Sequence, residues 1–497
     1  MVKSVVEEHL NPTEELSLDI IKKRVVKGVV VLTGRMFLLQ VFSLVAYFFL
    51  TILLSVEQLG VFFLVSAVRN FFGYFSDIGL AAAIIQKKEK VEEIELRTTF
   101  TVQQILGVVI ILVLFATTPL FQSLYKLSQP SIYLLWALGF SLLFSSLRSV
   151  PSALMERELQ FGKLVIPQMF EMLLFHGITV VLAFAGLGIT SFTIATIISG
   201  ITGLVLTYYM RPWTPALVFN KAAFHRLLRF GLPYQVNTFL AVAKDDGMTL
   251  VLGGIIGPAG VSFVGWAQKW ANAPLRFFMD SVIKVSFPAF SRMQHNKSEL
   301  SAAVSRAIFF ICSLAFPAII GLALIAPSLT EIIPKYEKWQ PALLALILIG
   351  INAGFAAVTT PITNMLNAIG KISITFRLMI MWTLLTWIFI PILAVRYNVN
   401  GVALGFAIVG MSSLVAIIWS NKFVNIDFIG SVFVPLVSSL GMGVVVFVLG
   451  NIIPLGILGV ISMLVIGAAT YVLILYLFLG EDLKKDFRSL YAIVTKR

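Results

Sequence analysis

This chain of 497 residues has little charge, one cysteine and four histidines, and each shortage excludes a class of protein. Charged residues make up 12% of the chain, about half of the ~25% usual in soluble domains, which excludes a soluble protein. The single cysteine, Cys312, excludes a disulfide framework and a cysteine-based zinc site. The histidines His9, His176, His225 and His295 show no metal-binding spacing. We therefore expect neither a bound metal nor a cofactor.

Long connections and catalytic motifs are also absent. No stretch between apolar runs exceeds roughly twenty residues, whereas a folded catalytic domain needs ~100. No P-loop, HExxH or GxSxG motif occurs in the sequence. These absences argue against an enzyme.

Apolar residues, by contrast, are abundant along the entire chain. They make up 59% of it, and the mean hydropathy is +0.96. One membrane anchor needs only ~20 apolar residues, so this excess indicates many spans. Long runs without the short alternation of barrel strands predict helices. We therefore predict an all-α polytopic membrane protein with fourteen transmembrane helices, at about residues 28–53, 57–86, 98–120, 131–152, 164–187, 188–210, 230–256, 259–288, 301–327, 340–365, 373–396, 399–420, 428–450 and 453–479.

The basic residues are distributed unevenly between the two predicted sides of the membrane. In this topology twenty-six of the 37 Lys and Arg residues lie at the two termini and near the connections after even-numbered spans, against four on the opposite side. Because cytoplasmic loops are enriched in Lys and Arg, we predict a multi-pass protein of the cytoplasmic membrane with both termini in the cytoplasm. Topology also accounts for most of the net charge of +13, so nucleic acid is not an expected partner.

An internal repeat divides the predicted spans into two lobes. Residues 51–70, aligned with 251–270, place Arg69 over Lys269, a cation at matched depth in each half. Two six-helix halves related by a repeat are typical of transporters. We expect a cytoplasmic amphipathic N-terminus (1–27), an N-terminal six-helix lobe (28–210), an amphipathic cytoplasmic linker (211–229), a C-terminal six-helix lobe (230–420), two extra helices (421–479) and a cytoplasmic tail (480–497).

Seven cations remain inside the predicted spans and are the strongest indication of function. They are Arg35, Arg69, Arg148, Lys244, Lys269, Arg276 and Lys284. A charge at the centre of a membrane helix is unfavourable by ~2.5–3.5 kcal/mol, so the deeper ones should face the protein interior. In the predicted span 259–288, the last three of these cations and Asp280 fall within about 80° of arc and form one polar stripe. Trp266 and Trp270 flank Lys269 there, and they either stack on sugar rings or pack among the helices.

Acidic side chains inside the spans leave two interpretations of these cations open. The acids are Asp77, Glu171, Asp245, Asp246 and Asp280. They could neutralise five of the seven cations in interior ion pairs that hold helices together, and one of them could carry a coupling ion, H⁺ or Na⁺. Asp77 is expected below Arg69 on the same helix. The excess of two cations and the matched depth of Arg69 and Lys269 favour a cavity for an anion, and Arg and Lys suit phosphate or pyrophosphate.

Three stretches of the sequence resemble a known transporter family. They are LGVFFLVSAVRNFFGYFSDIGLAAAIIQKKE (59–89), RPWTPALVFNKAAFHRLLRFGLPYQVN (211–237) and FPAFSRMQHNKSEL (287–300). In these small and apolar residues the chain is similar to the polysaccharide-transporter family of the multidrug/oligosaccharidyl-lipid/polysaccharide (MOP) exporter superfamily. The resemblance implies two six-helix bundles that alternate between inward-open and outward-open states. It also implies a cationic central cavity and a lipid-linked oligosaccharide or O-antigen repeat unit as cargo.

The sequence therefore predicts a flippase for a polyprenyl phosphate- or pyrophosphate-linked glycan. The seven cations would hold the phosphates while membrane lipids surround the tail, and a glycan polymerase or glycosyltransferases are expected neighbours. A cation-coupled drug or small-molecule antiporter of the same superfamily is the first alternative, although an acidic cavity would be expected for it. A membrane glycan polymerase is a more remote alternative, because it would want a sizeable external loop and a catalytic carboxylate.

Overall fold

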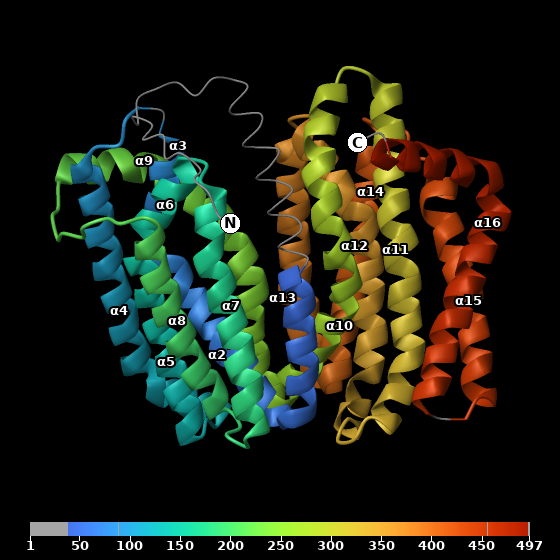
Figure 1. Cartoon of the computed structure of the whole chain (residues 1–497), viewed down its shortest axis with the longest axis horizontal. Coiled ribbons are helices and arrows are strands. Elements are labelled where there is room, and N and C mark those ends of the chain that lie inside the picture. Colours follow the sequence, from blue (N-terminus) through green and yellow to red (C-terminus); the bar gives the residue numbers. More distant parts are fainter. Residues whose placement is uncertain (1–37, 88, 455, 496–497) are drawn as a thin grey trace, which may run out of the picture. The chain divides into compact units, whose positions relative to one another are not determined.

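The structure, a computed structural model, describes residues 38–87, 89–454 and 456–495, and every regular element in this part of the chain is a helix (Figure 1). The predicted all-helical class is therefore confirmed. The helices form two compact units. The first unit holds the described residues up to Leu50 together with Val65–Asp246, and the second holds Thr51–Leu64 together with the described residues from Gly247 onward.

The helix bounds follow the chain in order. Before the unit boundary at Asp246 lie the helix Leu38–Leu53, α2 (Val56–Gly73), η1 (Tyr74–Ser76), α3 (Leu80–Gln86), α4 (Glu93–Tyr125), α5 (Gln129–Leu147), α6 (Ser149–Arg157), α7 (Phe161–Phe184), α8 (Thr190–Met210), α9 (Lys221–Val242) and most of η2 (Ala243–Gly247). After it lie α10 (Met248–Met293), α11 (Lys297–Ile332), η3 (Glu337–Ala342), α12 (Leu343–Ala368), α13 (Ile372–Ser412), α14 (Leu414–Ser420), η4 (Ile429–Phe433), α15 (Val434–Ile452) and α16 (Ile457–Thr495).

Many of these helices are long and apolar enough to cross a membrane. The described residues contain 11 such helices and one shorter apolar helix, Leu38–Leu53. Two of the longest are kinked, at Gly257 in α10 (φ 68°) and at Asn398 in α13 (φ 53°). Both kinks fall in the short gaps between predicted spans, 256–259 and 396–399. The exact number of fourteen spans stays a prediction.

Three predicted segments have a different local structure from the one expected. The run 57–86 is not one helix, because the chain leaves α2 after Gly73 and only the short α3 follows. The run 131–152 is divided at Arg148, which separates α5 from α6. In the linker 211–229, helix begins only at Lys221, and the preceding backbone is bound to α4: the N–H groups of Val218 and Asn220 donate to threonine hydroxyls there.

Each unit has its own apolar core. In the first unit, α3, α4, α6 and α9 share a core that includes Phe100 and Val150. In the second unit, α10, α11 and α12 pack around Ile311. Met442 of α15 and Met463 of α16 lie in a further core with α11. The two C-terminal helices therefore pack on α11.

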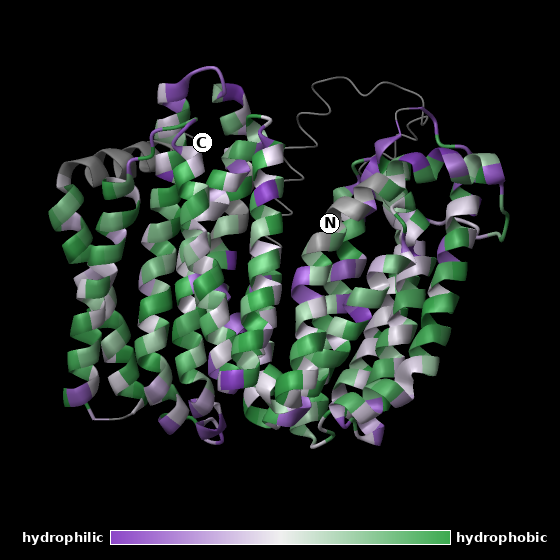
Figure 2. Ribbon diagram, turned by 180° about the vertical axis from the view of Figure 1, so that it is seen from behind, coloured by the Kyte–Doolittle hydropathy of each residue, from purple (hydrophilic) through white to green (hydrophobic). Residues whose placement is uncertain are grey.

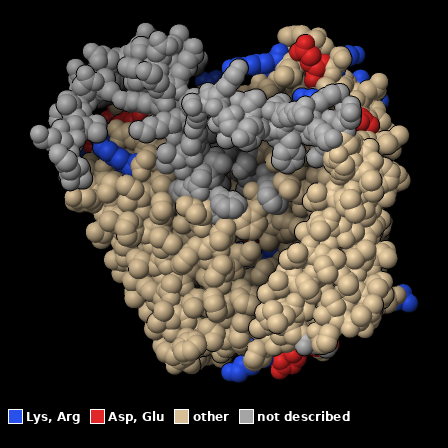
Figure 3. Space-filling view, turned by 45° about the vertical axis from the view of Figure 1, so that its right-hand side comes forward, with Lys and Arg blue, Asp and Glu red and all other residues tan. Residues whose placement is uncertain are grey.

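The outward faces of the helices are also apolar. Phe184 is 81% exposed and Leu458 is 83% exposed. Figure 2 shows hydrophobic residues along the helices of each unit, with hydrophilic residues mainly at helix ends and in connections. On the face drawn in Figure 3, the charged residues lie mostly at the upper and lower margins, and most of the surface between them is uncharged. Such faces are unfavourable in water and match lipid, so this is a multi-pass membrane protein.

Candidate functional site

Arg69 lies near the end of α2, in the first unit, and makes no direct ion pair with any acidic side chain that the structure describes. Its Nη1 donates a hydrogen bond of 3.2 Å to Oδ1 of the adjacent Asn70. Its Nε is buried and has no hydrogen-bond partner among the described residues. Adjacent side chains on a helix point about 100° apart, so the guanidinium turns sideways to reach its neighbour.

Asn70 links Arg69 to a second element of the same unit. Its Nδ2 donates a hydrogen bond of 3.2 Å to Oδ1 of Asp246. Asp246 belongs to η2, a π-helical turn that follows α9 and also carries Lys244 and Asp245. Nζ of Lys244 lies 2.6 Å from Oδ1 of Asp245. Such turns insert one extra residue into a helix and often occur at functional sites.

Arg148 and Glu171 form a two-point ion pair in the first unit. Both Nη atoms of Arg148 donate to the carboxylate, and the distance from Nη2 to Oε1 is 3.0 Å. Arg148 lies between α5 and α6, and Glu171 lies on α7. On α8, Gly203 provides the room for this pair, because a β-carbon there would lie 2.5 Å from Nη1 of Arg148 and 3.0 Å from Oε2 of Glu171. The pair thus depends on four helices.

The charges around Arg69 are arranged so that it stays available to a ligand. Glu171, Arg148 and Asp246 act on it electrostatically. Arg148 engages both oxygens of Glu171, and Asn70 donates to Asp246. The bidentate pair with Arg148 is of the strong, charge-assisted kind, whereas Asp246 accepts from a neutral amide at 3.2 Å. The result is a half-buried guanidinium with N–H donors that no described residue uses, and the planar fork of arginine suits phosphate and pyrophosphate.

Asp77 does not lie on the same helix as Arg69; its carboxylate instead binds the first N–H groups of α3. Its backbone is extended (φ −134°, ψ 96°), and its Oδ1 accepts hydrogen bonds from the N–H of Leu80 at 2.9 Å and of Ala81 at 3.3 Å. Nε2 of Gln103 also donates to it, at 3.2 Å. The expected placement on one continuous helix with Arg69 is wrong, because α2 ends before Asp77 and its carboxylate caps α3.

The second unit holds the other described cations of the predicted site. Lys269 and Arg276 lie on α10 and are exposed. After its kink α10 is one continuous helix, so all four positions of the predicted stripe share it. The side chains of Asp280 and Lys284 lie outside the described part of the structure, as does the whole of Arg35. Their roles stay predictions.

Trp266 packs inside the second unit and is not available to a sugar. It is 2% exposed, and its ring stacks on Trp339 with centroids 5.4 Å apart. Its Nε1 donates a hydrogen bond of 3.2 Å to the hydroxyl of Tyr336, which also accepts from Thr51 at 3.3 Å. Burial raises the pKa of Tyr336 above its ordinary value, so this hydroxyl stays protonated. Sugar stacking is therefore wrong for Trp266 and stays a prediction for Trp270.

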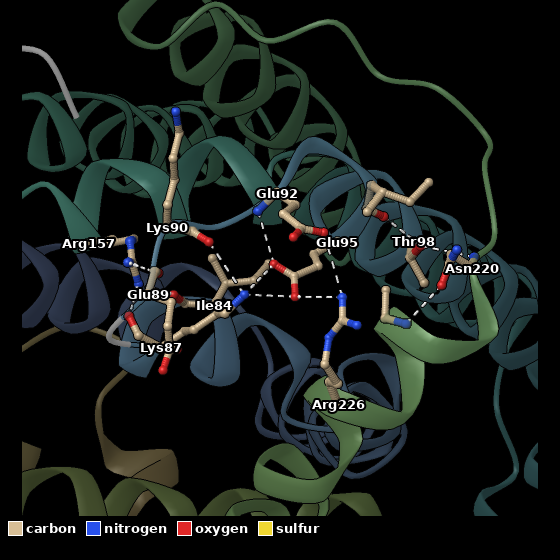
Figure 4. A network of polar contacts seen from close by, with 12 residues as sticks. Ile84, Lys87, Glu89, Lys90, Glu92, Glu95, Thr98, Arg157, Asn220 and Arg226 are labelled. Atoms are coloured by element: carbon tan, nitrogen blue, oxygen red, sulfur yellow. Dashed lines mark hydrogen bonds and ion pairs between the residues drawn. The ribbon is translucent and has the colours of Figure 1, made fainter. Parts of the chain in front are cut away.

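A separate charged cluster centres on Glu95, in the first turn of α4 (Figure 4). The side chain of Glu95 is fully buried. It accepts hydrogen bonds from Nζ of Lys87 at 2.8 and 2.9 Å, from Nη2 of Arg226 at 3.4 Å and from the N–H of Glu92 at 3.0 Å. Arg157 donates to backbone carbonyls at the end of α3 and in the connection to α4. One carboxylate thus ties the ends of α3, α4 and α9 together.

The sequence identified charged residues and missed the residues that arrange them. Asn70 was visible as a polar neighbour of a cation within an apolar run. The role of Gly203 could not be predicted from the sequence, because it depends on which helices pack together. Glu95 lies before the predicted span 98–120 and resembled a loop charge. Among the described residues, no group of three His, Cys, Asp or Glu side chains is placed to hold a metal ion.

Comparisons with known proteins give a consistent picture. The family described as "Polysaccharide biosynthesis protein" matches residues 49–344. The lipopolysaccharide biosynthesis protein WzxC of Escherichia coli K12 is 27% identical over 340 residues, 67% of this chain and 68% of that protein. The succinoglycan biosynthesis transport protein ExoT of Rhizobium meliloti 1021 is 23% identical over 437 residues, 86% of this chain and 87% of that protein.

Solved structures of similar fold are also known. The lipid II flippase MurJ, in an inward closed conformation, superposes with a TM-score of 0.74 at 16% sequence identity. The match covers 91% of this chain and 100% of that chain. At this identity the likeness establishes the fold.

Proposed function

We propose that this chain, which belongs to the family of polysaccharide biosynthesis proteins, is a membrane transporter that flips a lipid-linked oligosaccharide or polysaccharide repeat unit across the cytoplasmic membrane. The lipid would be a polyprenyl phosphate or pyrophosphate, and the cycle would be alternating access between two lobes. The names of the relatives, a lipopolysaccharide biosynthesis protein and a succinoglycan transport protein, support a glycan cargo. The chain would carry its cargo without changing it.

The observation that carries this proposal is the state of Arg69. An unpaired guanidinium within a membrane helix is unfavourable by about 2.5–3.5 kcal/mol, so such a residue indicates a functional site. Both acids that act on Arg69 are engaged by other donors, which leaves a cation that an anionic ligand can neutralise. A phosphate group linked to a lipid supplies that charge at membrane depth.

The proposal also assigns roles to the other predicted cations, to the topology and to a coupling ion. Arg69 would bind the phosphate with Lys269 as its counterpart in the second lobe. The further cations of the proposed site are Lys244, Arg276, Arg148, Lys284 and Arg35. Fourteen spans in two six-helix bundles plus two C-terminal helices, with both termini cytoplasmic, complete the proposed topology. An H⁺ or Na⁺ gradient would drive the cycle, and glycosyltransferases or a glycan polymerase would supply or use the cargo.

The alternatives differ in the charge that they require. A drug or small-molecule antiporter would need an acidic group to bind a cation. Asp246 accepts a hydrogen bond from Asn70, and the nearby positive charge of Arg69 disfavours a further cation at that carboxylate. A glycan polymerase would need a catalytic carboxylate outside the spans. Glu95 is a buried carboxylate near the start of α4, but Lys87 and Arg226 already neutralise it.

The test is outward delivery of a radiolabelled lipid-linked glycan in liposomes that contain the purified protein. Arg69→Ala and Lys269→Ala should each weaken cargo binding by about ten- to a hundredfold, since charged hydrogen bonds contribute ~1.5–3 kcal/mol. Arg69→Lys should be milder, because the charge remains although the fork is lost. Membrane-inserted protein level and melting temperature are measured in parallel. Normal folding with lost flipping supports the site, and full flipping in both alanine variants would discard it.

A further inference from the structure

We propose that Asn70 is a positioning residue whose amide separates Arg69 from Asp246 and so keeps the Arg69 guanidinium available for the phosphate of the cargo. The inference rests on the proposed function and assigns a role to a neutral side chain. Asn70 need not touch the cargo. It would act through Arg69, to which it is hydrogen-bonded at 3.2 Å.

The chemistry of the two hydrogen bonds fixes the orientation of this amide. A carboxylate accepts only, and a guanidinium donates only. The Asn70 oxygen must therefore face Arg69, and its nitrogen must face Asp246, as the structure has them. If the amide were reversed, its NH₂ group would face the N–H donors of Arg69 and its oxygen would face the carboxylate of Asp246, so neither hydrogen bond could form. A side chain that is neutral, donates and accepts is required at this position.

Removing the amide would expose Arg69 to Asp246. Arginine has a long side chain, and a direct pair with a carboxylate forms two strong parallel hydrogen bonds. Such a pair would use the N–H donors that a phosphate needs and would set a negative charge beside the ligand. In a partly buried site this repulsion is screened less than in water. The Asn70 amide therefore prevents a competitor from capturing the binding group.

The other nearby acid needs no such separator. Glu171 is already held by both Nη atoms of Arg148. Asp246 is the one acid acting on Arg69 whose described partner is a neutral side chain. Any loss caused by removing Asn70 should therefore depend on the charge of Asp246, which makes the inference testable by a double substitution.

The experiment measures binding of farnesyl pyrophosphate to the purified full-length protein by titration calorimetry, with inorganic pyrophosphate as competitor. Asn70→Leu should bind the probe about tenfold more weakly or worse, the effect of losing a charged hydrogen bond. Asp246→Asn alone should bind the probe at least as tightly as the wild type does, because a negative charge near the ligand is removed. The double variant Asn70→Leu with Asp246→Asn should recover at least wild-type affinity, because residue 246 then has no carboxylate to pair with Arg69 and Glu171 stays paired with Arg148.

The control is Asn451→Leu, the same substitution at an exposed asparagine that bonds only within its own helix, and it should leave probe binding unchanged. Thermal melting reports folding of every variant. Should Asn70→Leu not fold, Asn70→Ala and its double variant with Asp246→Asn carry the same comparison. If Asn70 had only a structural role, removing the charge of Asp246 would not restore probe binding to the Asn70 variant.

The outcomes separate this inference from the proposed function. If Arg69→Gln binds the probe as the wild type does, the phosphate does not bind at Arg69, and both the site and the role of Asn70 fall. If Arg69→Gln loses binding while the folded Asn70 variant keeps it, only the positioning role is overturned. Loss in the single Asn70 variant without recovery in the double variant also overturns it.

Discussion

A β-carbon at Gly203 would lie 2.5 Å from Nη1 of Arg148, closer than side-chain carbons in proteins approach other atoms. The absence of a side chain on α8 therefore permits the ion pair of Arg148 with Glu171. Because Glu171 also acts on Arg69, this packing contact is connected to the charge balance of the candidate site. Gly203 on α8 therefore influences how free Arg69 on α2 is to bind a ligand.

Gly203→Ala should displace Arg148 from Glu171 and destabilise the protein by about 1–3 kcal/mol, as overpacking commonly does. The measurement is the melting temperature of the detergent-purified protein. Gly177→Ala on α7 is the control, since a β-carbon there would meet nothing within 4 Å. Equal melting temperatures for the two variants would contradict the packing argument.

Glu95→Gln should destabilise the first unit, because Lys87 and Arg226 lose the charge that they share. We expect a loss of about 1.5–3 kcal/mol, the size of a hydrogen bond between charged groups. The control is Glu93→Gln in the same helical turn, whose pair with Arg97 is exposed and should contribute under about 1 kcal/mol. Limited proteolysis and thermal melting would show both effects. A Glu95 variant as stable as the Glu93 variant would count against the network.

Gly60→Ala should prevent correct folding of the second unit. A β-carbon at Gly60 would overlap the backbone carbonyl of Pro258, which cannot turn aside as a flexible side chain can. We expect a sharp fall in folded protein, measured by size-exclusion chromatography after membrane extraction. Gly354→Ala is the control, because its β-carbon would make an ordinary contact with Phe316 at 3.7 Å. A normal yield of folded Gly60→Ala would refute the close approach.

If an ion gradient drives transport, one of four acidic residues in the first unit should bind the coupling ion. If H⁺ or Na⁺ drives transport, Asn or Gln in place of Asp77, Glu171, Asp245 or Asp246 should make flipping independent of the gradient in at least one case. Asp77→Asn should in addition lower stability, because Asp77 caps α3. Transport is measured in liposomes with and without each gradient. Unchanged gradient dependence in all four variants would remove these acids as carriers of the coupling ion.

Membrane topology can be checked with fused reporters. Fusions after Arg24, within 211–229 and after Lys484 should report the cytoplasm, because these segments lie on the side of the predicted topology that carries most of the Lys and Arg residues. Fusions near Lys126 and Lys338 should report the opposite side. A terminus found outside would overturn the fourteen-span topology.

Several features were predictable from the sequence because they depend on composition along the chain. Apolar runs long enough to span a bilayer must be helical, since backbone groups cannot stay unbonded in lipid. The all-helical class and the resemblance to polysaccharide transporters are accordingly confirmed. The kinks in α10 and α13 lie in the short gaps between spans that were predicted from the apolar runs. The break after Gly73 was missed, because the apolar run continues across it.

What the sequence by itself determined is that this is a helical membrane protein with arginine and lysine inside its apolar segments. It could not say which of these cations are paired. Arg69 and Arg148 look alike as charges within apolar runs. Among the described residues, however, Arg148 forms an ion pair with Glu171, whereas Arg69 donates to the amide of Asn70. Only the tertiary structure decides this difference, because electrostatic and hydrogen-bond energies depend on distances between residues far apart in the chain.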